Sequence, residues 1–283
     1  MFLRRGILYV AGAVVLIAPP AAWLISSLAT NPPRRVFAPV ELKASTAERG
    51  AAPLIDLVER DPAAVVRMGI ERYDREIREY RCVLFKQERL AGGLTPVQEV
   101  EVRFRQSPQT VYMLWRTNAD QAKRALFIDD GRNVDQEGHK LARVEPAGAI
   151  VRLLVKDVYM PIDGPEARKA SRRTINECGF RSTFDLLERY NAVAAEHGVL
   201  DFKYAGIGVV DGRPTYVIVR TLPRAGVGDV YPDARMVLHL DQEWLLPVAV
   251  YSYADHEEKE LLGSYVFTQV ELNPGFGEDA FRF

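Results

Sequence analysis

Cysteine and histidine are scarce in this sequence. Only Cys82 and Cys178 occur among 283 residues, which is too few for a disulfide scaffold, and they lack the paired spacing of a structural zinc site. The four histidines stand singly, without an HExxH motif and without two in helical register. The sequence therefore does not indicate a metal hydrolase, and it predicts no metal site and no cofactor.

An excess of charge of one sign is also missing. Lysine and arginine together number 37, and aspartate and glutamate number 38. A chain this close to neutrality has no global field to hold a polyanion, so nucleic acid is not a predicted partner. The composition is otherwise globular, with 48% hydrophobic residues, and it excludes disorder for most of the chain.

A long uncharged run lies near the amino terminus. Residues 6–28 carry no charge, and at about 1.5 Å per residue they would form a helix of about 34 Å, which is enough to cross a bilayer. Arg4 and Arg5 precede the run, as in a signal peptide or a signal anchor. We favour an uncleaved transmembrane helix in the inner membrane, because the apolar region of a signal peptide usually has about 7 to 15 residues.

The alternative to an anchor is a signal peptide that is cleaved near Ala29, which would release the protein into the periplasm. Both interpretations place the rest of the chain outside the cytoplasm. The predicted organisation is a signal anchor or signal peptide over residues 1–29, a proline- and alanine-rich linker over 30–60, and one domain over 61–283.

Three helices are expected in that domain. Residues 62–79 follow an aspartate that can cap them, begin with proline, and carry one apolar stripe. A short amphipathic helix is expected over residues 149–159. The third helix is expected over residues 183–197, with Ser182 and Asp185 as a capping box.

The remaining segments alternate as antiparallel strands do. Asp211-Gly212 is a strong two-residue hairpin signal, and Ala91-Gly92-Gly93 marks another turn. About eleven strands are expected, six before the two later helices and five after them. They cover residues 82–90, 97–106, 110–116, 123–129, a short pair around 137–138, and 200–210, 215–222, 234–240, 247–253 and 261–272. Strands in hairpins with few helices predict an α+β fold with helices on one face of a curved antiparallel sheet.

Several segments resemble a known family. They are residues 80–89, 111–113, 172–179, 245–248 and 265–267, with Asn273 and Phe281. Together they resemble the bacterial envelope family called domain of unknown function 1571, over nearly all of residues 61–283. The chain departs from the family pattern at Arg173 and at Thr174, where proline is expected.

The resemblance implies a fold similar to the outer-membrane lipoprotein carrier, an incomplete antiparallel barrel of about eleven strands around an apolar cavity that helices close. It implies no established activity. Such a cavity suits acyl chains, because each buried methylene contributes about 0.8 kcal/mol. The predicted lining residues are Phe104, Tyr112, Trp115, Phe202, Tyr204, Met236, Tyr251, Tyr265 and Phe267. The same side chains would also serve as a closed core.

Three classes of function follow. The first is a membrane-tethered extracytoplasmic protein that binds an acyl chain, a lipid or a lipoprotein. The second is a structural or partner-binding envelope protein whose barrel is filled by its own side chains. The third is a hydrolase of unknown type. The sequence favours the first and predicts no catalytic residue and no enzyme, because charges of opposite sign in the motif are expected to pair.

That expected pairing is a structural ion network. Lys86 and Glu88 share one face of the first strand, and one charge at least is expected to point toward the covered side of the sheet. We expect Glu88, Arg89, Arg172 and Glu177 to connect the first strand with the loop before the last helix.

The two cysteines allow two interpretations. A disulfide between Cys82 and Cys178 would join the first strand to the segment before the last helix, and an oxidising compartment permits it. Alternatively, both are small buried hydrophobic side chains, as unpaired cysteines often are.

Overall fold

The computed structural model describes residues 54–148, 156–223 and 230–283. The predicted anchor or signal peptide, most of the predicted linker and most of the helix expected over 149–159 lie outside these residues. Within them, no helix is both long enough and apolar enough to span a membrane.

The folded part begins earlier than expected. Helix α1 (Ile55–Arg60) lies in the segment assigned to the linker, and its Val58 is fully buried. Helix α2 (Pro62–Glu76) confirms the first predicted helix, with Pro62 at its start. The Asp61 carboxylate caps it by accepting a hydrogen bond from the Ala64 amide at 2.9 Å. The last residues of the predicted linker are therefore helical. A helix of six residues is too short to show a helical repeat of apolar residues in the sequence.

The last helix begins three residues before its predicted start. Helix α5 (Phe180–Glu196) starts after Gly179, whose φ of 114° suits glycine. Ser182 lies inside the helix, and its hydroxyl donates to the Asn176 carbonyl instead of capping. The short helices α4 (Pro165–Ala170) and η1 (Ile175–Glu177) precede it, and neither was predicted.

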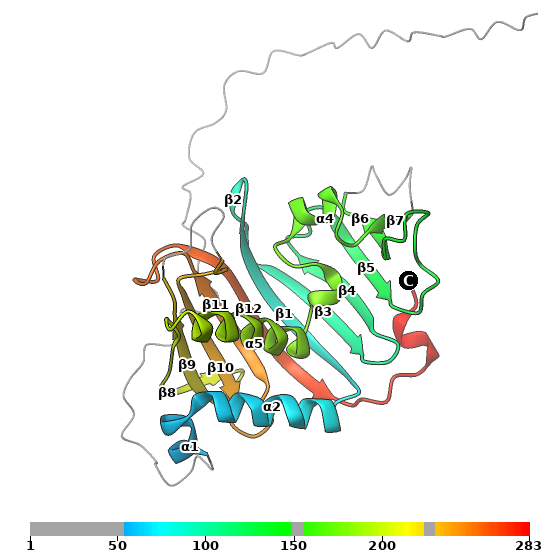
Figure 1. The fold of residues 1–283 in the computed structure, drawn as a ribbon. Helices are drawn as coiled ribbons and strands as arrows, with labels where there is room; N and C mark the ends of the chain where they lie inside the picture. The colour runs from blue at the N-terminus through cyan, green and yellow to red at the C-terminus, as the bar shows by residue number, and fades with distance from the viewer. Residues whose placement is uncertain (1–53, 149–155, 224–229) are drawn as a thin grey trace, which may run out of the picture. The chain divides into compact units, whose positions relative to one another are not determined.

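All but one strand of the sheet form a single antiparallel path (Figure 1). The order is β7-β6-β5-β4-β3-β1-β12-β11-β10-β9-β8, and β2 pairs with β1. The strands are β1 (Glu79–Leu90), β2 (Gly93–Leu94), β3 (Gln98–Arg105), β4 (Thr110–Thr117), β5 (Ala122–Ile128), β6 (Leu141–Pro146), β7 (Val158–Pro161), β8 (Asp201–Val210), β9 (Arg213–Thr221), β10 (Arg235–Asp241), β11 (Pro247–Tyr253) and β12 (Leu261–Leu272). The short helix η2 (Glu278–Phe281) follows. This open antiparallel sheet with few helices agrees with the predicted α+β incomplete barrel.

The helix expected over residues 149–159 is wrong at its carboxyl end, which lies among the described residues. Val158 and Tyr159, expected to end a helix, belong to β7 and pair with Val144 and Arg143 of β6. A short apolar segment does not distinguish helix from strand by its period alone, and here the free edge of β6 provides the hydrogen-bonding partner.

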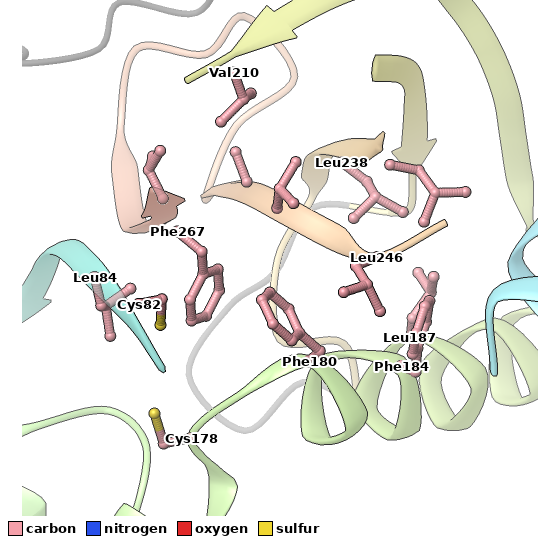
Figure 2. Close-up of a cluster of buried hydrophobic side chains, with 14 of the residues drawn as sticks. Cys82, Leu84, Cys178, Phe180, Phe184, Leu187, Val210, Leu238, Leu246 and Phe267 are labelled. Atoms are coloured by element: carbon pink, nitrogen blue, oxygen red, sulfur yellow. The ribbon is translucent and has the colours of Figure 1, made fainter. Parts of the chain in front are cut away.

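Helices α2 and α5 lie across one face of the sheet, as the apolar stripes predicted (Figure 1). We call this the inner face, and the opposite one the outer face. Phe180, Phe184 and Leu187 of α5 are at most 3% exposed. They point toward side chains from the sheet and the β10–β11 turn, among them Leu238, Leu246 and Phe267 (Figure 2). Leu187 and Phe267 of this packed cluster also line the cavity described below.

A buried histidine lies on the outer face. His239 of β10 is 3% exposed, and its Nδ1 lies 3.0 Å from the Thr215 hydroxyl. Its ring meets Tyr251 edge to face, with 6.0 Å between the ring centroids. Burial lowers the pKa of His239 from 6.5 to about 4, so the folded protein keeps this ring neutral in mild acid.

This histidine predicts a pH-dependent stability. Between pH 6.5 and about pH 4 the unfolded chain binds a proton at His239 that the folded chain does not, so stability falls with falling pH in that window. The expected loss from this group is about 3 kcal/mol. Urea unfolding at a series of pH values should show it as a difference between the wild type and His239→Asn. An equal loss of stability with falling pH in the wild type and in His239→Asn would contradict the assignment of this effect to His239. The control is His197→Asn, because His197 is exposed and its removal should leave the pH dependence unchanged.

Candidate ligand cavity

A cavity of about 430 Å³ lies between the inner face of the sheet and the segment formed by α4, η1 and α5. Its wall is mostly apolar, with contributions from nearly every strand of the sheet. The apolar side chains include Leu84, Met113, Trp115, Ala125, Ala142, Val144, Met160, Ile162, Ile175, Leu187, Met236, Val250 and Phe267. The volume lies in the range of about 300 to 1,000 Å³ that is typical of small-molecule sites.

The structure places four of the nine predicted lining residues on this wall. They are Trp115 of β4, Met236 of β10, and Tyr265 and Phe267 of β12. Trp115 is held in place because its indole Nε1 donates to Gln98 Oε1 at 3.1 Å. Sheet alternation brings these side chains from distant strands to the inner face.

The other five lie elsewhere. Tyr112 is on the outer face, where the Arg103 guanidinium stacks 5.0 Å from its ring centroid, and Tyr251 contacts His239 there. Phe104 stacks on Tyr80, with 4.8 Å between the ring centroids. It lines a second, separate cavity of about 500 Å³ and does not line the apolar cavity.

Phe202 and Tyr204 of β8 pack against the core at the far end of the sheet from β7, and neither lines the cavity. Tyr204 meets Tyr216 edge to face, with 6.4 Å between the ring centroids. These two aromatic side chains are therefore half-buried and pack against the edge of the core.

A charged cluster forms part of the wall. Glu88 of β1 has a side chain that is 2% exposed, and Lys86 on the same strand face donates to it at 3.1 Å. The Ser171 hydroxyl, after α4, donates to the same carboxylate at 2.9 Å, and the Tyr265 hydroxyl does so at 2.7 Å. Lys86 Nζ also lies 3.1 Å from Ser171 Oγ. The expected inward-pointing charge is therefore an ion pair with two hydroxyl groups.

The contacts of Glu88 set its protonation. Burial alone would raise the pKa of this carboxyl, but the charge of Lys86 and the hydrogen bonds from Tyr265, Lys86 and Ser171 outweigh burial and hold the pKa below its usual value. Burial, followed by the neighbouring Glu88 charge, raises the pKa of Tyr265 far above its usual range. At neutral pH the cluster therefore holds a carboxylate and a neutral phenol.

The four residues expected to form one ion network are divided among separate contacts. Arg89 donates to the Leu261 carbonyl at 2.9 Å and lies 3.8 Å from Glu260. Glu177 accepts from the Thr174 amide at 3.0 Å in the capping box of η1. In the described part of the chain, no ion pair joins Arg172 to Glu88 or Glu177. The pairing of Glu88 is local because Lys86 on its own strand is nearer than either arginine.

A second charged cluster lies on the β9–β11 side of the cavity. Arg220 of β9 is 2% exposed and donates to both oxygens of Asp233, at 2.9 and 3.2 Å. It also donates to Asn191 of α5 at 3.2 Å, and the Ser252 hydroxyl donates to Asp233 at 2.9 Å. Sequence reasoning missed this cluster. Its signal was the position of Arg220 two residues after Ile218 on the inward face of an apolar strand.

Both cysteines are free and buried. Cys82 of β1 and Cys178, which lines the cavity, lie on facing elements with their sulfur atoms toward each other (Figure 2). Burial raises the pKa of the Cys178 thiol to about 12 and that of Cys82 well above its usual value. In this structure the two thiols pack in the core, and a disulfide between them stays a prediction.

The cavity offers hydrogen-bond donors in an apolar wall. The Ser171 hydroxyl donates to the Glu88 carboxylate, and Lys86 Nζ lies 3.1 Å from Ser171 Oγ, so this serine belongs to the hydrogen-bond network of the ion pair. Among residues 54–148, 156–223 and 230–283, no three carboxylate, histidine or cysteine side chains gather as a metal site.

The sequence profile of a family described as "Protein of unknown function (DUF1571)" matches residues 77–283. No curated protein matches the chain. Solved structures that match include MucB, at 17% identity and a TM-score of 0.46, over 78% of this chain. The chain covers only 62% of that MucB chain.

Two further matches are lipoprotein LppX of Mycobacterium tuberculosis and a LolA superfamily protein of Nitrosomonas europaea. For LppX the identity is 16% and the TM-score 0.39, over 72% of this chain and 92% of that one. For the second the identity is 10% and the TM-score 0.31, over 78% and 97%. At these values the similarities concern the fold alone.

Proposed function

The chain belongs to the DUF1571 family, and from that premise we propose that it is an extracytoplasmic binding protein whose cavity holds the acyl chains of a lipid or a lipoprotein. The family is described as one of unknown function, so the proposal depends on the cavity. Its single supporting observation is an apolar volume of about 430 Å³ that the side chains of the described residues leave unfilled beneath α5.

A cavity that exists before binding matters for affinity. About ten buried methylenes contribute roughly 8 kcal/mol, which association costs of about 4 to 15 kcal/mol can cancel. A preformed apolar space reduces those costs, because little side-chain order has to be created on binding. This supports binding of an acyl chain in the cavity, and it weighs against the alternative of a barrel filled by its own core.

The membrane part of the proposal comes from the sequence. The uncharged residues 6–28 follow Arg4 and Arg5, and they would tether the domain to the inner membrane with the cavity in the periplasm. A cleaved signal peptide remains the alternative. In either case the domain would have access to the lipids of the envelope.

Filling the cavity tests the proposal. Val144→Trp replaces a small side chain of the cavity wall with an indole ring that occupies part of the cavity. It should weaken binding of a pyrene-labelled diacylglycerol, delivered from cyclodextrin, by about tenfold or more. That effect corresponds to about two methylenes excluded at about 0.8 kcal/mol each. Fluorescence titration of the purified full chain measures it.

The matched control is Val209→Trp, because Val209 is 53% exposed on β8 and is not in the cavity wall. Urea midpoints of both variants identify any loss of binding that comes from unfolding. Equal binding by Val144→Trp and the wild type, or no binding by the wild type, would reject the cavity as a lipid site and favour the partner-binding alternative.

A further inference from the structure

Among the described residues, one cationic side chain of the cavity wall has no partner. Lys86 pairs with Glu88 at 3.1 Å, and Arg220 pairs with Asp233 at 2.9 Å. Arg173 also lines the cavity, but its guanidinium makes no ion pair and no hydrogen bond with another described residue. The Arg173 side chain is half-buried rather than enclosed. Its N–H donors are therefore open to a ligand, unlike those of the two paired cations.

Arg172 brings a second guanidinium to the same end of the cavity. Its side chain is exposed and likewise makes no ion pair with a described residue. Burial and then the Glu88 charge raise the pKa of Tyr265, a residue of the cavity wall, and the charges of Arg173 and Arg172 oppose that rise. Such an effect requires both guanidinium groups to lie near the Tyr265 side of the cavity.

The carboxylates of the wall leave these two arginines free. Besides Asp233, the wall holds Asp120, Glu166 and Glu177, and none of them lies within ion-pair distance of either arginine. An anion at this position would therefore meet two guanidinium groups whose donors are not already occupied. A guanidinium presents its N–H groups as a planar fork that fits two oxygens of a phosphate.

Other polar groups of the wall lie beside the arginines. The Ser171 hydroxyl oxygen lies 3.4 Å from the Arg173 amide and 3.1 Å from Lys86 Nζ, and Ser171 and Tyr265 donate to the same Glu88 carboxylate. Most of the remaining wall is apolar. A ligand that matches both parts carries acyl chains and a negatively charged head group. A neutral glyceride would fill the apolar part and leave the arginines without a counter-charge.

We infer that Arg172 and Arg173 bind the phosphate of a phospholipid whose acyl chains lie in the cavity. This inference rests on the proposed function, and it specifies the ligand class as acyl lipids with a phosphate next to the chains. Arg173 would contact the phosphate from the wall, and Arg172 from the exposed side. The attraction is stronger at the edge of an apolar cavity than in bulk water, because the effective dielectric constant is lower there.

Matched lipids test the inference in the wild-type protein. Dipalmitoylglycerol and dipalmitoyl phosphatidic acid have the same chains and differ only in the phosphate. Each competes with the pyrene-labelled diacylglycerol for the full chain at low ionic strength. We expect phosphatidic acid to bind about tenfold more tightly or better, which is the usual net effect of a hydrogen bond between charged groups. Salt at about 0.5 M should reduce this preference, because it screens charges that solvent can reach.

A double variant connects the preference to the two arginines. Arg172→Gln/Arg173→Gln should bind the two lipids equally and keep the wild-type affinity for dipalmitoylglycerol. The matched control is Arg67→Gln/Arg75→Gln, which removes the same charge from side chains of α2 that are 57% and 67% exposed. No residue of α2 lines the cavity, so the control should keep the preference. If urea midpoints show that the first variant does not fold, Arg172→Gln alone should reduce the preference.

The outcomes separate the two proposals. Equal binding of both lipids by the wild type overturns the role of the arginines and leaves a lipid cavity in place. A preference that survives in Arg172→Gln/Arg173→Gln, or that the α2 control loses to the same extent, does the same. No binding of either lipid overturns both proposals.

Glycerol 3-phosphate distinguishes a lipid head group from a free phosphate, because it carries the phosphate without the chains. Titration calorimetry of the full chain measures its affinity. Weaker binding than that of phosphatidic acid supports a phospholipid ligand, since the chains then contribute to the affinity. Binding as tight as that of phosphatidic acid would identify a site for free phosphate esters and overturn the inference.

Discussion

Alanine in place of Gly179 is expected to destabilise the protein by roughly 2 to 6 kcal/mol, the sum of about 1 to 3 for backbone strain and about 1 to 3 for overpacking. Gly179 has a φ of 114°, which side chains disfavour. A Cβ there would lie 2.0 Å from the Tyr80 hydroxyl oxygen, and Tyr80 is fully buried. Urea unfolding of the purified protein measures the loss.

Two further variants separate the causes. Gly198→Ala has a φ of 69° with no atom within 4 Å of the new Cβ, so it should cost only about 1 to 2 kcal/mol of strain. Adding Tyr80→Phe to Gly179→Ala removes the hydroxyl and leaves the nearest ring carbon at 3.3 Å, which should restore part of the stability. An equal cost for Gly179→Ala and Gly198→Ala would refute the steric argument.

The second large effect concerns the ion pair in the cavity wall. Glu88→Leu should cost about 3 to 5 kcal/mol, because it leaves Lys86, whose side chain is 11% exposed, without a counter-charge. Ser171 and Tyr265 would lose their acceptor as well. The double variant Lys86→Met/Glu88→Leu should recover most of the loss, since paired removal leaves no buried charge. Chemical denaturation of both variants measures the difference.

An exposed pair is the control for that comparison. Lys203 and Asp201 lie 2.8 Å apart, with side chains 77% and 45% exposed. Removing such a pair changes stability by at most about 1 kcal/mol. If Glu88→Leu cost no more than Asp201→Leu, the buried pair would not stabilise the wall as proposed.

The strands were predictable because their cause is local. Apolar and polar residues alternate in β3, and the Asp211-Gly212 signal gives a turn with φ values of 51° and 74°, as a tight hairpin requires. The cap of α2 was predictable for the same reason. Helices α4 and η1 were not, since they are too short to show a period and depend on packing over the cavity.

The cavity was predictable only in part. Alternation says which residues share a face, but not which face lies under the helices. In β4, which is apolar on both faces, Trp115 lines the cavity and Tyr112 does not. Arg220 was missed because a charge in a strand is expected outside. Its burial depends on Asp233 and Asn191, which only the folded chain brings to it.

The strand order affects the width of the cavity. The radius of a closed barrel is determined by the number and stagger of its strands. Here β7 and β8 are the two ends of the order (Figure 1), so the β5–β7 wall and the β9–β11 wall are connected through β3, β1 and β12. In the described sheet no closed ring of strands fixes the width of the cavity, since β7 and β8 are its two ends. For the acyl ligand proposed above, the curvature of the sheet would therefore set the thickness of ligand that fits.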